Sequence, residues 1–155
     1  MDGEFIVNGE RLKVSFRPAA TLLDILRREG HTEVKEGCRE GQCGSCVILL
    51  KGRLVNSCQV LAASAMGKEI TTVKGLGSLH APHPIQTAFV EAGAVQCGFC
   101  TPGMILASYS LLKKNQNPDE EEIRKALDGN LCRCTGYVKI VDAIKLAARR
   151  MRTDE

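Results

Sequence analysis

Eight cysteines constrain this chain more than any other feature of its sequence. They form two groups of four within 155 residues: Cys38, Cys43, Cys46 and Cys58, then Cys97, Cys100, Cys132 and Cys134. Thiols scattered through a core would not fall into two such sets. We expect no secretory or twin-arginine leader, so a disulfide framework, which needs an oxidising compartment, is disfavoured. The cysteines therefore predict metal or cluster binding.

Composition and charge narrow the possible partners. Hydrophobic residues make up 44% of the chain, enough for a packed core, and the net charge is only +3. The charges are evenly spread without a basic stripe, so we expect no nucleic-acid partner. Because no apolar run is long enough to cross a bilayer, we also expect no membrane association and a cytoplasmic protein.

The first half of the chain predicts β-structure around one short helix. Asn8-Gly9 lies between two stretches of alternating apolar residues and accepts the positive φ angles of a two-residue hairpin turn. Thr21, followed three residues later by Asp24, predicts a capping box at the start of a helix. A closing strand is expected at 69–73.

The second half predicts helices. Pro84 favours the start of a first helix, and Thr101-Pro102 predicts a cap followed by proline at the first helical position. A third helix is expected over 118–128, and a fourth from Thr135. This half therefore predicts an all-helical unit.

A boundary between the halves is expected near residue 76. Residues 74–83 are rich in Gly and Pro and show no hydrophobic periodicity, which is typical of a linker. We therefore expect one domain over residues 1–76 and a second over residues 77–155.

The first cysteine group has the spacing of a plant-type [2Fe-2S] site. Its first three members are spaced C-x4-C-x2-C, but the gap to Cys58 is short. A hairpin with its turn at Lys51-Gly52 would explain the short gap, because it would place Cys58 beside Cys46. Structural zinc usually takes two short knuckles, so it is the weaker alternative.

The second group consists of two close pairs. An antiparallel hairpin of helices over 102–114 and 118–128 would return Cys132 and Cys134 to the level of the first pair. Both pairs would then precede helix N-termini, which favour negative charge. Zinc stays open here, since CxxC and CxC both suit it.

The motifs "GCREGQCGSC", "QCGFCTPGM" and "NLCRCTGY" together resemble the iron–sulfur subunit of the xanthine oxidase family of molybdenum hydroxylases. The resemblance covers essentially residues 4–150 and includes all eight cysteines. It implies an α+β chain: an N-terminal β-grasp domain like plant-type ferredoxin, then an all-α four-helix domain. Each domain would hold one [2Fe-2S] cluster.

The resemblance also implies partners. These are a large subunit with molybdopterin and a medium subunit with FAD, assembled as a dimer of heterotrimers. Electrons would pass from molybdenum through the second cluster, then the first, to flavin, and Gln96 would lie near the pterin. No catalytic residue is expected on this chain. The alternatives are a self-contained two-cluster ferredoxin and a zinc-organised adaptor without redox activity.

Overall fold

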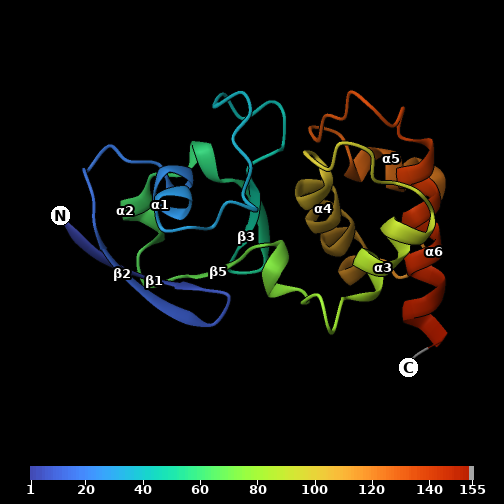
Figure 1. Cartoon of the computed structure of the whole chain (residues 1–155), viewed down its shortest axis with the longest axis horizontal. Helices are drawn as coiled ribbons and strands as arrows, with labels where there is room; N and C mark the ends of the chain where they lie inside the picture. The colour runs from blue at the N-terminus through green and yellow to red at the C-terminus, as the bar shows by residue number, and fades with distance from the viewer. Residues whose placement is uncertain (154–155) are drawn as a thin grey trace.

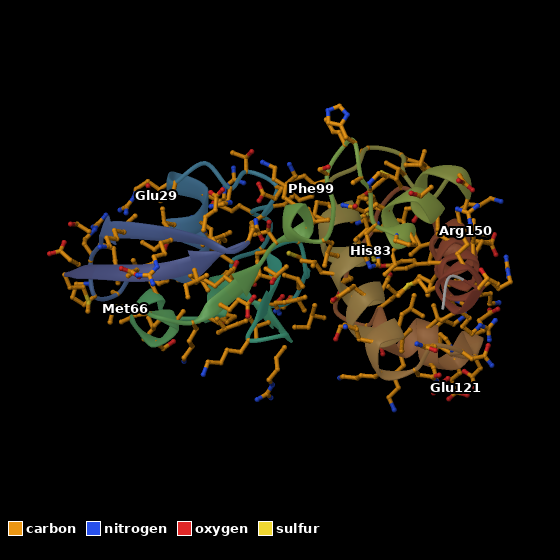
Figure 2. All side chains as sticks on the ribbon, turned by 90° about the horizontal axis from the view of Figure 1, so that it is seen from below. Glu29, Met66, His83, Phe99, Glu121 and Arg150 are labelled. Atoms are coloured by element: carbon orange, nitrogen blue, oxygen red, sulfur yellow. The ribbon has the colours of Figure 1, made fainter. Side chains whose placement is uncertain are left out.

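The computed structural model describes residues 1–153 as a sheet-containing half and a helical half packed side by side (Figure 1). A view at right angles shows the same two lobes (Figure 2). Glu29 and Met66 lie in the sheet-containing lobe, and Glu121 and Arg150 lie in the helical lobe. Within residues 1–153, no helix has the length and apolar character needed to span a bilayer.

The sheet has five strands in the order β2-β1-β5-β3-β4. β1 runs parallel to β5, and the other neighbouring strands are antiparallel. The strands are β1 (Asp2–Val7), β2 (Glu10–Ser15), β3 (Val47–Leu50), β4 (Arg53–Asn56) and β5 (Glu69–Thr71). Helix α1 (Leu22–Arg28) buries its apolar side chains in the same core as the sheet. The expected β-grasp architecture is confirmed.

Both predicted hairpin turns are present. Asn8 and Gly9 have φ angles of 52° and 86°, and Lys51 and Gly52 have φ angles of 50° and 73°. Two consecutive positive φ angles characterise the tight turn whose twist matches that of paired strands. The predicted capping box of α1 is also confirmed, with both of its hydrogen bonds formed.

The expected closing strand is present as β5 but ends at Thr71, and three other short elements between β4 and α3 were not predicted. They are a 3-10 turn (Ser57–Gln59), helix α2 (Ala62–Ala65) and a second 3-10 turn (Val73–Gly75). The first of these turns contains Cys58, so it fixes the position of a predicted ligand.

Up to residue 153, the helical half contains four helices, as expected. They are α3 (Pro84–Glu91), α4 (Thr101–Lys114), α5 (Glu120–Ala126) and α6 (Val138–Thr153). Their apolar faces enclose one core that includes Phe89, Met104 and Ile144.

Three helix starts and lengths differ from the prediction. Cys100, not Thr101, is the N-cap residue of α4. The expected helix over 118–128 is shorter, because the Asp119 side chain caps α5 at its start and the chain turns away after Ala126. Helix α6 begins three residues after Thr135, because left-handed φ angles at the two preceding residues exclude a right-handed helix.

The two halves share an apolar contact. Leu106 of α4 is 1% exposed and packs with Val47 and Leu49 of β3. This contact fixes α4 against the sheet, next to the loop that carries the first three cysteines.

Candidate metal centres

The first cysteine group lies around the loop between α1 and β3. Cys38, Cys43 and Cys46 belong to this loop, and Cys58 follows β4. The β3–β4 pairing places Ser57 against Cys46, whose carbonyl accepts both the Ser57 backbone N–H (3.3 Å) and its hydroxyl (2.7 Å). The predicted hairpin thus brings Cys58 beside Cys46.

Backbone amides of this loop point at its sulfur atoms. The Cys38 Sγ accepts from the backbone N–H groups of Glu40 (3.3 Å), Gln42 (3.4 Å) and Cys43 (3.4 Å). These donors, with Glu40 the largest contributor, lower the pKa of Cys38 to about 6. The loop therefore stabilises a thiolate, which is the form that binds iron.

Close backbone packing makes this geometry possible. A Cβ at residue 37 would lie 2.7 Å from the Cys43 Sγ, and Gly37 avoids that contact. Gly44 has a φ of +68°, and a Cβ there would lie 2.3 Å from the carbonyl oxygen of Gly129. Larger residues at either position would displace the loop.

The two inner cysteines of this group are buried. Cys46 is 2% exposed and Cys58 is 7% exposed. Burial raises the pKa of Cys46 to about 11 in the metal-free chain. A buried thiolate needs a compensating positive charge, and iron would supply one.

The second group lies on the two loops that flank α4 and α5. Cys97 and Cys100 precede α4, and Cys132 and Cys134 precede α6. Cys97 and Cys134 are exposed, whereas Cys100 and Cys132 are half-buried. Burial raises the pKa of Cys100 to about 12. One edge of this site therefore faces outward.

Only one of the two cysteine pairs lies directly at the N-terminus of a helix. Cys100 occupies the N-cap position of α4, although its side chain makes no capping hydrogen bond. Because α6 begins at Val138, the expectation that Cys132 and Cys134 immediately precede a helix is wrong. At this second pair, side chains make the hydrogen bonds in place of the N-terminal amides of a helix.

Thr135 and Tyr137 organise the second pair instead. The Thr135 hydroxyl donates to the Cys132 Sγ at 3.1 Å. The Tyr137 hydroxyl accepts from the Cys132 backbone N–H (2.9 Å) and donates to the Asn130 carbonyl (3.0 Å). Burial acts to raise the pKa of Cys132, but the hydrogen bonds from Thr135 lower it overall.

A backbone hydrogen bond connects the two sites. The N–H of Leu131, next to Cys132, donates to the carbonyl of Cys43 at 2.9 Å. The buried Asn130 side chain donates to the Gly44 carbonyl at 3.2 Å. Asn130 was not predicted as a site residue, because its partner lies 86 residues away along the chain.

The thiols meet in pairs in both sites. Within residues 1–153, no three His, Cys, Asp or Glu side chains converge on a point that would hold one metal ion. Each site contains two pairs of thiols that lie close enough for one to shift the pKa of the other: Cys38 with Cys43, Cys46 with Cys58, Cys97 with Cys134, and Cys100 with Cys132. A [2Fe-2S] cluster takes two thiolates on each of its two irons, so this pairwise arrangement suits it better than a single zinc ion.

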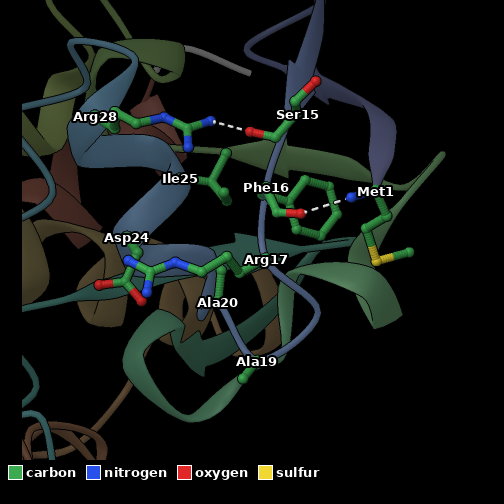
Figure 3. A pocket seen from close by; sticks show the side chains of 9 residues that line it. All are labelled: Met1, Ser15, Phe16, Arg17, Ala19, Ala20, Asp24, Ile25 and Arg28. Atoms are coloured by element: carbon green, nitrogen blue, oxygen red, sulfur yellow. Dashed lines mark hydrogen bonds between the residues drawn. The ribbon is translucent and has the colours of Figure 1, made fainter.

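Two pockets of the surface contain no cysteine in their lining. The pocket in Figure 3 has a volume of about 640 Å³ and lies between the end of β2 and α1. A second hollow of about 920 Å³ lies between the 73–82 segment and α3.

Two polar residues beside the second site are exposed. Gln96 precedes Cys97, and its side chain has no hydrogen-bond partner among residues 1–153. Arg133 lies between Cys132 and Cys134, and it likewise makes no contact with a cysteine sulfur in the described part of the chain. Both side chains are free to face a partner.

Family comparisons match the two halves separately. Residues 5–71 match the 2Fe-2S iron-sulfur cluster binding domain family. Residues 72–145 match the [2Fe-2S] binding domain family. The chain therefore carries one cluster-binding domain of each kind.

Similar proteins extend the match to nearly the whole chain. The nicotinate dehydrogenase small FeS subunit of Eubacterium barkeri is 49% identical over 145 residues, 93% of this chain and 92% of that protein. The xanthine dehydrogenase iron-sulfur-binding subunit of Escherichia coli O157:H7 is 44% identical over 146 residues, 91% of this chain and 90% of that protein. This chain belongs to the family of iron–sulfur subunits of molybdenum hydroxylases.

Solved structures agree with this family. The iron–sulfur subunit superposes on a chain of quinoline 2-oxidoreductase from Pseudomonas putida 86 with a TM-score of 0.93 and 41% identity, covering 100% and 98% of the two chains. The aldehyde oxidoreductase from Desulfovibrio desulfuricans gives a TM-score of 0.94 at 39% identity. The iron–sulfur subunit spans 99% of its own length but 17% of that longer chain.

The iron–sulfur subunit holds two [2Fe-2S] clusters, one in each domain. Its residues fit these groups in two independent respects. Four thiols are available at each site, and the loop amides that point at Cys38 are the donors that a sulfur-rich anion requires.

Proposed function

We propose that this chain carries electrons between a molybdenum centre and a flavin, both held by larger partner subunits of one oxidoreductase. The proposed cluster ligands are Cys97, Cys100, Cys132 and Cys134 at the second site, and Cys38, Cys43, Cys46 and Cys58 at the first. A bound [2Fe-2S] cluster supplies one-electron redox chemistry there. The proposal places the substrate site and the catalytic residues on the partner subunits.

The hydrogen bond from Leu131 N–H to the Cys43 carbonyl is the observation that carries this proposal. Leu131 is covalently joined to Cys132, so only backbone and one hydrogen bond separate a ligand of each cluster. Such a connection favours electron transfer between the sites, since electronic coupling falls steeply across empty space. The chain is thereby suited to conduct from one cluster to the other.

The exposed edge of the second site supports the proposal that a partner subunit binds there. Phe99, Leu131 and Val138 lie within four residues of the cysteines of this site and are 46%, 59% and 60% exposed. Exposed apolar side chains of this size, gathered around exposed cysteines, are typical of an interaction surface. We assign this edge to the subunit that carries molybdopterin.

Gln96 is the proposed contact with the pterin. It lies next to Cys97, is exposed, and has an amide that offers two donors and one acceptor. A polar pterin across the interface could use all three. The relatives' membership of multi-subunit enzymes supports such an interface.

The first site is assigned to the flavin side. Cys38 and Cys43 are half-buried on the outer part of their loop, so an electron can leave the chain there. The proposed assembly is a dimer of heterotrimers containing this chain, a medium FAD subunit and a large molybdopterin subunit, located in the cytoplasm.

A free two-cluster ferredoxin is the alternative function. It would carry the same clusters but would need no permanent interface. The apolar side chains around the second site favour the subunit, because a freely diffusing carrier would leave them exposed to water.

The variant Gln96→Ala tests the proposal in the assembled enzyme. It removes no ligand, so both clusters should assemble, while electron transfer from molybdenum to the second cluster should slow. Losing one neutral hydrogen bond of about 0.5–1.5 kcal/mol predicts impairment of roughly two- to tenfold. Rapid-reaction kinetics would measure the rate. The control is Gln42→Ala, which changes an exposed glutamine near the first cluster.

An unchanged rate in Gln96→Ala would refute the role of Gln96. Failure of the chain to bind any partner would refute the subunit function.

A further inference from the structure

Gln59 joins two parts of the first site. Its side-chain Nε2 donates to the Arg39 carbonyl at 2.9 Å and to the Cys58 Sγ at 3.3 Å. Arg39 lies in the cysteine loop, and Cys58 lies in the 3-10 turn after β4. One amide thus bridges the two segments that supply the ligands of this site.

The orientation of this amide follows from its partners. A carbonyl oxygen and a cysteine thiolate are both acceptors, so the NH₂ end of Gln59 must face them. One of its two hydrogens points to each acceptor. The hydrogen bond to the Cys58 Sγ is therefore part of the ligand environment, and it comes from a side chain rather than from the backbone.

Packing holds the Gln59 side chain in this position although the residue is exposed at the surface. A Cβ at Gly41 would lie 2.9 Å from Gln59 Cγ, so the side chain lies directly against the Gly41 backbone. Asn56 independently ties the same loop, because its Nδ2 donates to the Gly41 carbonyl at 2.9 Å. The loop therefore keeps one restraint when the Gln59 amide is removed.

We propose that Gln59 sets the reduction potential of the first cluster by donating a hydrogen bond to the Cys58 Sγ. Gln59 is a positioning and tuning residue and does not bind iron. The inference rests on the proposed role of Cys58 as a ligand of that cluster.

The sign of the change in reduction potential follows from the negative charge that the cluster gains on reduction. Uptake of one electron from the second cluster makes the first cluster and its four thiolates more negative by one unit. A hydrogen bond to a ligand sulfur becomes stronger as that sulfur becomes more negative, so it favours the reduced form. Gln59 therefore raises the potential of the first cluster and helps it to accept the electron.

The test is a redox titration of the assembled enzyme, followed by the EPR signals of both clusters. Gln59→Met keeps an unbranched side chain over Gly41 but cannot donate. We expect the first cluster to become roughly two- to tenfold harder to reduce, and a tenfold change corresponds to about 59 mV for one electron. Gln59→Glu should lower the potential further, because it adds a negative charge. The potential of the second cluster is the internal reference.

Gln42→Met is the matched control. Gln42 is an exposed glutamine of the same loop, and its side chain makes no hydrogen bond among residues 1–153; its backbone N–H, which donates to the Cys38 Sγ, is kept in the variant. This variant should leave both potentials unchanged. An unaltered first-cluster potential in Gln59→Met would overturn the proposal, and so would loss of the first cluster in that variant.

A fourth variant separates this inference from the ligand assignment. Cys58→Ser should alter or abolish the EPR signal of the first cluster. If that signal persists unaltered, the ligand assignment is wrong and the inference fails with it. If Cys58→Ser changes the signal while Gln59→Met does not shift the potential, the tuning role alone is refuted.

Discussion

The cysteine sulfurs of the two sites accept hydrogen bonds from different kinds of donor. At the first site, three backbone N–H groups point at the Cys38 Sγ. At the second, the Thr135 hydroxyl donates to the Cys132 Sγ, and Tyr137 holds the backbone beside it. Side-chain substitutions should therefore perturb the second site more readily than the outer part of the first.

The variant Tyr137→Phe tests this difference. It removes the hydroxyl that accepts from the Cys132 N–H and donates to the Asn130 carbonyl. Leaving both groups without their partner should cost about 1–3 kcal/mol. We expect the EPR signal of the second cluster to disappear at lower urea concentration than in the wild type.

Tyr109→Phe is the control for that experiment, because its hydroxyl makes no hydrogen bond among residues 1–153. It should retain the wild-type urea midpoint. Equal midpoints for Tyr137→Phe and the wild type would show that the Tyr137 hydroxyl does not support the site.

At the scale of elements, α4 connects the two sites. Its N-cap is Cys100, and its first turn contains Gly103. A Cβ at Gly103 would lie 2.5 Å from the Gly44 carbonyl oxygen and 2.9 Å from the Asn130 Nδ2. The helix therefore lies against the loop of the first site and against the residue that joins the two sites.

The variant Gly103→Ala tests this contact. In an open helix, alanine would stabilise by about 0.5–1 kcal/mol relative to glycine. Here the added methyl group overlaps backbone and a buried side chain, so we expect a loss of about 1–3 kcal/mol. Urea unfolding followed by circular dichroism would measure it.

Ser110→Ala, on the half-exposed part of the same helix, provides the comparison. It changes helix propensity without creating a clash, so it should not destabilise the protein. A stabilising effect of Gly103→Ala would refute the close approach between α4 and the first loop.

At the scale of the whole molecule, the two halves depend on each other. Leu106 covers Val47 and Leu49 of β3, which directly follow Cys46. The matched families meet between residues 71 and 72, and we propose the domain boundary at residue 76. Wherever the domain boundary lies, the two halves are joined by this apolar contact as well as by the linker.

The pair Leu106→Ala and Leu112→Ala tests this dependence. Both leucines belong to α4 and are 1% exposed, but Leu112 belongs to the helical core and not to the cluster that Leu106 forms with β3. Each truncation should cost about 2–5 kcal/mol. Only Leu106→Ala should lower the temperature at which the first cluster is lost, as monitored by EPR. A first cluster of wild-type thermal stability in Leu106→Ala would mean that the halves are energetically independent.

Local patterns predicted much of the fold. The turn residues Asn8-Gly9 and the capping pair of Thr21 and Asp24 act within a few residues, so their structural role is visible in the sequence. The start of α6 was misjudged at Thr135. Its later start depends on left-handed backbone angles, and at Tyr137 such an angle is unusual for a residue other than glycine.

The sequence by itself indicated two four-cysteine sites, the candidate ligands and a β-rich half followed by a helical half, because cysteine spacing and hydrophobic periodicity are local properties. The assignment of a [2Fe-2S] cluster to the second site came from the family resemblance. Only the tertiary structure decided how the sites connect. The hydrogen bonds from Leu131 to Cys43 and from Asn130 to Gly44 join residues more than 80 positions apart. Gln59 is separated by 20 residues from its Arg39 acceptor. The first two contacts accompany the packing of α4 against the sheet-containing half, and the third joins two loops of that half; no short stretch of sequence specifies either arrangement.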